Sequence, residues 1–70
     1  MQINKKIILV KKFFKKNIDI NQNLFQNNDL DSLKVLDLIN FIEKKIKKKI
    51  SPKKVSQKSF SSIKEIVKIF

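Results

Sequence analysis

The hydroxyl of Ser32 is the side chain in this sequence whose setting best suits covalent chemistry. Asp31 precedes it, Leu33 follows it, and apolar residues at helical spacing come next. Those apolar residues are Val35, Leu36, Leu38, Ile39, Ile42 and Ile46. The pattern predicts a helix that begins at Ser32, and we interpret the serine as a covalent attachment point. The alternative is that Ser32 or Asp31 only caps the helix, a contribution of about 0.5–2 kcal/mol.

The helix that begins at Ser32 is expected to span residues 32–48, because Pro52 disfavours helical geometry in the residue before it. Its inner face is expected to consist of Leu33, Leu36, Leu38, Ile39, Ile42 and Ile46, with Phe41 beside them. Asp29 and Asp31 stand at the positive end of the helix dipole. Lysines crowd the negative end: Lys44, Lys45, Lys47, Lys48 and Lys49. Each exposed charge in such a position contributes roughly 0.3–1 kcal/mol.

Two segments before this helix are expected to hold it in place. Residues 2–16 should form a helix with an apolar stripe of Ile3, Ile7, Val10 and Phe14. Residues 17–31 are rich in asparagine, which favours turns. Apolar residues are interspersed among the asparagines: Ile18, Ile20, Leu24, Phe25 and Leu30. A disordered linker would not contain so many, so we expect a long ordered loop pinned to the core.

The chain after Pro52 is expected to contain two shorter elements. Residues 53–58 are long enough for one helical turn. Ser62 and Glu65 then have the spacing of a capping box, which predicts a last helix. Its inward residues are Ile63, Ile66, Val67 and Phe70. The predicted fold is therefore all-α: a small four-helix bundle of three main helices and a short third helix, with a long loop between helices 1 and 2. Residues 1–70 should form a single domain.

The composition excludes several kinds of site. The chain has no cysteine and no histidine, which removes disulfides, cysteine nucleophiles and cysteine/histidine zinc sites. We expect no metal. No apolar run approaches the roughly 18 residues of a membrane span, and no pattern of a secretory signal is present. We therefore expect a soluble, cytoplasmic protein.

The net charge of +11 comes entirely from lysine, since the chain has 17 basic residues and no arginine. Such a charge suits a nucleic acid or an anionic membrane as partner. The chain also lacks glycine and alanine and is rich in Lys, Asn, Ile and Phe, which fits an A/T-rich genome equally well. The alternative function is therefore a lysine-rich helical protein that binds nucleic acid or an anionic membrane surface. That alternative gives Asp31-Ser32-Leu33 no role.

Residues 24–70 resemble the acyl carrier protein family, which includes peptidyl and D-alanyl carriers. The family's signature is Asp-Ser-Leu at the start of its second helix, and here it is Asp31-Ser32-Leu33. Leu24-Phe25 and Leu30 are similar to the hydrophobic lead-in of these domains, and the apolar spacing after Ser32 resembles the second helix. Ile50-Ser51-Pro52 resembles the Ile-Pro stop, with the proline displaced by one position.

The resemblance implies that Ser32 receives 4'-phosphopantetheine from coenzyme A through a phosphopantetheinyl transferase. The arm would carry an acyl or aminoacyl thioester. The implied partners are that transferase, a loading ligase and a downstream acyltransferase or synthase. By the same resemblance Asp31 helps the transferase dock and Leu33 contacts partner enzymes. We expect further partner contacts at Lys34, Asp37, Ile39, Asn40 and Glu43. The chain itself would not be an enzyme, and we expect a monomer with no nucleic-acid partner and no stable membrane insertion.

The chain departs from the family in two places. The glycine often found two residues before the aspartate is Asp29 here, and lysines (Lys34, Lys44 and Lys45) replace acids that are common on the second helix. The second departure leaves open which synthase such a carrier would serve. A cavity for a tethered chain would be lined by Leu38, Ile42, Ile46, Ile63 and Ile66, and a filled core at these positions is the alternative.

Overall fold

The structure, a computed structural model, describes residues 2–70. All regular elements of this part of the chain are helices, as predicted. They are α1 (Ile3–Phe14), α2 (Ser32–Ile46), the 3-10 helix η1 (Pro52–Lys54) and α3 (Ile63–Ile66). No helix within residues 2–70 has both the length and the apolar character needed to cross a membrane.

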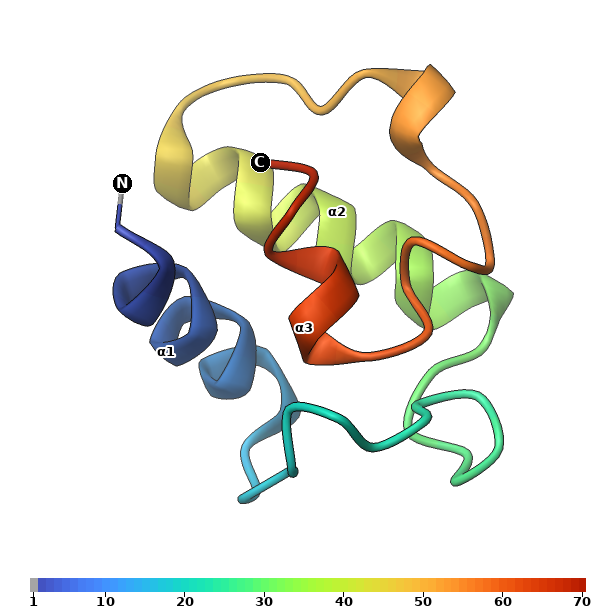
Figure 1. The fold of residues 1–70 in the computed structure, drawn as a ribbon. Helices are drawn as coiled ribbons and strands as arrows, with labels where there is room; N and C mark the ends of the chain where they lie inside the picture. Colours follow the sequence, from blue (N-terminus) through green and yellow to red (C-terminus); the bar gives the residue numbers. More distant parts are fainter. Residues whose placement is uncertain (1) are drawn as a thin grey trace.

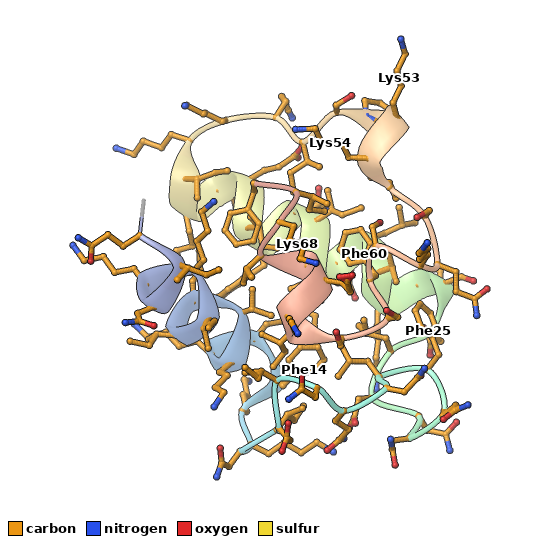
Figure 2. The ribbon with its side chains drawn as sticks, in the orientation of Figure 1. Phe14, Phe25, Lys53, Lys54, Phe60 and Lys68 are labelled. Atoms are coloured by element: carbon orange, nitrogen blue, oxygen red, sulfur yellow. The ribbon has the colours of Figure 1, made fainter. Side chains whose placement is uncertain are left out.

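The three α-helices meet around one core. α1 contacts both α2 and α3, and the start of α1 lies beside the end of α2 (Figure 1). Phe60 points into the space between α2 and α3 and is fully buried (Figure 2). The buried cluster also contains Val10, Ile18, Leu24, Leu30, Leu38, Ile42, Ile50, Ile63, Ile66 and Val67. The three α-helices, the long loop and the segments around Ile50 and Phe60 therefore contribute to the same core, whereas η1 contributes no buried residue.

Both long helices end two residues earlier than the sequence pattern predicts. α1 ends at Phe14 and α2 at Ile46, because the next residue in each case adopts a left-handed conformation. Lys15 has a φ of 56° and Lys47 a φ of 57°. Glycine is the usual residue at this position, but this chain has none. Lysine gives no such stop signal, so the pattern extended each helix too far.

The loop between α1 and α2 is ordered and pinned to the core, as predicted. Its residues Ile18, Leu24 and Leu30 are buried. The backbone N–H of Leu24 donates to Ser61 O at 2.8 Å, and the N–H of Lys64 donates to Ile20 O at 3.0 Å. The loop is thus bonded directly to the segment that leads into α3.

Three residues assigned to inner helix faces are exposed instead. Leu33 is 75% exposed, Leu36 is 58% exposed and Ile3 is 58% exposed. At about 100° per residue, Leu36 lies about 120° and Leu33 about 180° around α2 from the buried Ile42. Both therefore fall outside the buried stripe. Ile3 shares a face with Val10, but it lies in the first turn of α1, where little covers it.

The C-terminal elements are shorter than predicted. The single turn expected at residues 53–58 is η1, only three residues long, and α3 has only four residues. Ser62 Oγ accepts from Glu65 N at 3.3 Å, which is one half of the predicted capping box. The Glu65 carboxylate instead pairs with Lys68, with Nζ 3.0 Å from Oε2. Of the predicted inward residues of this segment, Ile63, Ile66 and Val67 are buried, whereas Phe70 is half-buried.

Candidate functional site

A tight turn delivers the chain to the start of α2. The carbonyl of buried Leu24 accepts from Asp29 N at 2.8 Å and from Leu30 N at 3.0 Å. Asn28 completes the turn with a φ of 60°, a conformation that asparagine tolerates better than most residues. Leu30 is buried, and its backbone N–H is bonded to the Leu24 carbonyl. These two contacts constrain the position of Ser32, two residues later.

Asp29 fixes this turn to the segment that follows α1. Its side chain is buried, with a residue exposure of 6%. It forms an ion pair with Lys16, and Gln22 Nε2 donates to its Oδ2 at 2.7 Å. The positive φ of the turn lies at Asn28 rather than at Asp29. The aspartate at position 29 therefore introduces no backbone strain.

Asp31, and not Ser32, caps α2. Asp31 has extended backbone angles, and its Oδ1 accepts from Lys34 N at 2.9 Å. Its carbonyl accepts from Val35 N, also at 2.9 Å. Ser32 is exposed in the first helical position, and within residues 2–70 its hydroxyl forms no hydrogen bond. The capping explanation thus applies to the aspartate and leaves the serine hydroxyl uncommitted.

The serine stands at the edge of an open groove of about 680 Å³. Ser32 and Asp31 line one end of it, and the walls come from three segments: the loop, the first turns of α2 and the chain after η1. The apolar wall residues are Phe25, Leu30, Val35, Leu36 and Val55. Asn28, Ser56 and Gln57 add polar atoms to the lining. The surface of the groove is therefore mainly apolar.

The predicted partner-binding residues lie in different settings on α2. Lys34, Asp37 and Asn40 are exposed, whereas Ile39 is half-buried. Glu43 is partly committed to the fold, because its Oε2 accepts from Ile50 N at 2.7 Å. The structure thus brings Lys34 and Asp37 onto the same exposed half of α2 as Leu33, and it uses Glu43 to hold the turn that follows the helix.

The residues proposed to line an internal cavity belong to the packed core. Leu38, Ile42, Ile63 and Ile66 are fully buried against one another and against Phe60. Ile46 packs against this cluster. These positions therefore form a filled core, as in the alternative to the cavity. The groove beside Ser32 is lined by other residues.

Sequence reasoning missed several walls of that groove. The sequence pattern predicts that Phe25 pins the loop and that Val35 and Leu36 belong to the apolar stripe of the helix, and these residues wall the groove instead. Val55 offered a usable signal, because it is the only apolar residue between Pro52 and Phe60. A lone apolar residue in a polar connection points to a contact with the body of the protein.

No group of acidic side chains within residues 2–70 is arranged to hold a metal ion. No protein-family model matches the chain, and no curated protein or solved structure matches it.

Proposed function

We propose that this chain is a carrier protein in which 4'-phosphopantetheine is attached to Ser32 Oγ. The arm would hold an acyl or aminoacyl group as a thioester and present it to biosynthetic enzymes in the cytoplasm. One observation carries the proposal: Asp31 caps α2, so the exposed Ser32 hydroxyl is free at the edge of a groove. In this proposal the three α-helices and η1 act together as a small four-helix bundle that holds the serine.

The residues around Ser32 fit the attached group. Lys34 N and Val35 N are bonded to Asp31, which leaves the N–H groups of Ser32 and Leu33 free at the positive end of α2. Free N–H groups at a helix start favour a phosphate. The groove of about 680 Å³ offers apolar walls to the arm beyond the phosphate. When bound, the group supplies the thiol that the chain lacks.

Attachment requires a bond between Ser32 Oγ and the phosphorus of coenzyme A that bears the pantetheine. The bond from that phosphorus to the bridging oxygen breaks, and adenosine 3',5'-bisphosphate leaves. No base within residues 2–70 is hydrogen-bonded to Ser32 Oγ, so the hydroxyl proton has to go to a base of the transferase. What this chain contributes is a fixed, accessible hydroxyl.

The exposed side of α2 is the proposed docking surface for partner enzymes. Leu33 offers an apolar contact with 75% of its surface exposed, and Asp31 lies directly beside the attachment point. Lys34, Asp37 and Asn40 continue this surface along the helix, with Ile39 and Glu43 at its margin. The proposed partners are the transferase, a loading ligase and a downstream acyltransferase or synthase.

The experiment is an intact-mass measurement after incubation with coenzyme A and a broad-specificity phosphopantetheinyl transferase. We expect one phosphopantetheine per chain in the wild type and in Ser56→Ala. Ser32→Ala should remain unmodified. Ser56 is the matched control, because it is an exposed serine that lines the same groove.

Two results would overturn the proposal. One is modification that persists in Ser32→Ala. The other is an absence of modification with both the broad-specificity enzyme and the transferase of the same organism. The second enzyme is necessary because a transferase that expects acidic carriers can reject the lysines of α2.

A further inference from the structure

Acidic residues lie toward the start of α2, together with lysines such as Lys16 and Lys34, whereas its end carries a dense group of lysines. Asp29, Asp31 and Asp37 lie at or near the Ser32 end. The other end carries Lys44, Lys45, Lys47, Lys48 and Lys49. The 15 residues of α2 separate the two ends by about 22 Å at 1.5 Å per residue. This is most of the longest dimension of the molecule, which is 29 Å.

The first turns of α1 add lysines to the basic end, because they lie beside the end of α2 (Figure 1). A hollow of about 310 Å³ between the helices is lined by Lys5, Ile8, Leu9, Lys12 and Lys45. A second hollow, of about 290 Å³, is lined by Lys6, Lys45, Ile46, Lys48 and Phe70. Lys45 is common to both hollows. Lys48 also lines a third hollow, with Lys44, Lys47 and Lys49, so the three hollows connect the lysines into one surface. We call it the lysine pole: Lys5, Lys6, Lys12, Lys44, Lys45, Lys47, Lys48 and Lys49.

The charge of the lysine pole is almost unneutralised. Within residues 2–70, Glu43 is the only acidic side chain that lines these hollows. Its carboxylate accepts from Ile50 N and lies 3.7 Å from Lys49 Nζ. Lys6 Nζ donates to Phe70 O. Within residues 2–70 the other six lysines of the pole form no ion pair.

An exposed apolar side chain stands within this basic surface. Ile8 is 56% exposed on the outer side of α1 and shares a hollow with Lys5, Lys12 and Lys45. Lysine side chains around an apolar residue are typical of helices that lie at a membrane interface, where the ammonium groups meet lipid phosphates and the apolar group enters the boundary layer. The surface contains no arginine, the side chain that most often reads guanine through two hydrogen bonds, so it lacks the usual means of sequence-specific DNA recognition.

We propose that the lysine pole is a docking surface for an anionic lipid membrane. The protein would adsorb to the lipid headgroups without crossing the bilayer, with Ile8 at the boundary. Each lysine near such a surface contributes about 1 kcal/mol. This orientation keeps the Ser32 end of α2 directed away from the membrane and open to other molecules. The inference goes beyond the carrier proposal and does not depend on it.

The test measures binding of the full chain to vesicles of phosphatidylcholine with and without phosphatidylglycerol, in about 0.1 M NaCl. The pole variant is Lys5→Gln, Lys12→Gln and Lys48→Gln combined. Its matched control is Lys53→Gln, Lys54→Gln and Lys64→Gln combined, which removes the same charge. Lys53 and Lys54 project from η1, far from α1 (Figure 2). Circular dichroism checks that both variants remain folded.

We expect binding that requires phosphatidylglycerol, a loss of about tenfold or more in the pole variant, and a loss of less than about threefold in the control. Ile8→Ser should also weaken vesicle binding several-fold while leaving binding to duplex DNA unchanged. Ser32→Ala should bind vesicles as the wild type does, which separates this proposal from the carrier proposal.

Three results would overturn the inference. Equal losses in the two triple variants would mean that the net charge acts without a defined surface. Tighter binding to duplex DNA than to the anionic vesicles at the same salt concentration would assign the pole to nucleic acid. Vesicle binding that is unchanged in Ile8→Ser would mean that Ile8 does not enter the membrane boundary, so the proposed orientation of the protein would be wrong.

Discussion

The carboxylate of Asp31 accepts a hydrogen bond from Lys34 N, and this bond decides what the neighbouring side chain is free to do. A helix has one N-cap residue, and aspartate is among the residues that suit this position best. Ser32 lies one residue inside the helix, so its hydroxyl is not needed there. The two residues therefore have separate roles, which single substitutions can resolve.

Asp31→Ala should lower the free energy of unfolding by about 1 kcal/mol, because α2 loses its cap. Asp31→Asn retains a side-chain oxygen at the same place and should cost only a few tenths of a kcal/mol. Ser32→Ala should be nearly neutral for stability, yet it should abolish attachment of phosphopantetheine. Urea denaturation followed by circular dichroism measures the free energy of unfolding of the three variants, and intact mass measures the attachment. If Ser32→Ala destabilises the fold as much as Asp31→Ala does, the serine is a cap after all.

At the scale of the elements, both long helices end on a lysine in a left-handed conformation. Lys15 and Lys47 have φ values of 56° and 57°. A side chain with a Cβ atom adopts this conformation at a cost of roughly 1 kcal/mol, which glycine avoids. A protein without glycine therefore retains this cost at the end of α1 and at the end of α2.

Lys47→Gly should raise the free energy of unfolding by up to about 1 kcal/mol, and Lys15→Gly should do the same. Lys12→Gly is the control, because it places glycine inside α1 and should cost about 1 kcal/mol. Thermal melts of the three variants measure these differences. A loss of stability in Lys47→Gly would mean that the lysine side chain contributes more at this position than its backbone conformation costs.

The inward and outward sides of α2 provide a second test at this scale. Leu38 is fully buried, whereas Leu36 is 58% exposed at the edge of the groove. Leu38→Ala should cost about 2–5 kcal/mol, because it leaves a cavity in the core. Leu36→Ala should cost less than about 0.5 kcal/mol, as expected for an exposed position. Denaturation of the two variants checks the assignment, which similar losses at both positions would contradict.

The elements also show what the sequence could and could not predict. Apolar residues in the asparagine-rich loop correctly predicted an ordered segment, because Ile18, Leu24 and Leu30 are buried in the core. The start of α2 was correct as well, since an aspartate before a helical pattern marks a cap. The helix ends were not readable, because lysine in a left-handed conformation leaves no trace in the pattern.

The site was predictable in part for a related physical reason. Local patterns placed Ser32 at the start of a helix, and that position depends only on neighbouring residues. The groove beside it depends on contacts between distant segments, such as Phe25 and Val55. An apolar stripe also overcounts the buried residues: Leu33 and Leu36 lie too far around α2 from Ile42 to reach the core.

At the scale of the whole molecule, the lysines far outnumber the acidic residues that could neutralise them. The chain has 17 lysines and six acids, and the ion pairs within residues 2–70 are Lys16–Asp29, Lys49–Glu43 and Lys68–Glu65. The lysine pole concentrates eight of those lysines at one end of a molecule only 29 Å long. Folding therefore brings the lysines of α1 close to those of residues 44–49, from which the unfolded chain keeps them apart.

Sodium chloride should stabilise this protein, because it screens that repulsion. The Debye length is about 30 Å at 0.01 M salt and about 10 Å at 0.1 M, so the charges act across the whole molecule only at the lower concentration. We expect the midpoint of thermal unfolding to rise by several degrees between these concentrations; about 1 kcal/mol corresponds to roughly 4–8 °C in a chain of this size. The triple variant of Lys5, Lys12 and Lys48 should melt higher than the wild type at low salt and respond less to added salt. A melting temperature that falls with salt in the wild type would mean that the three ion pairs outweigh the repulsion within the lysine pole.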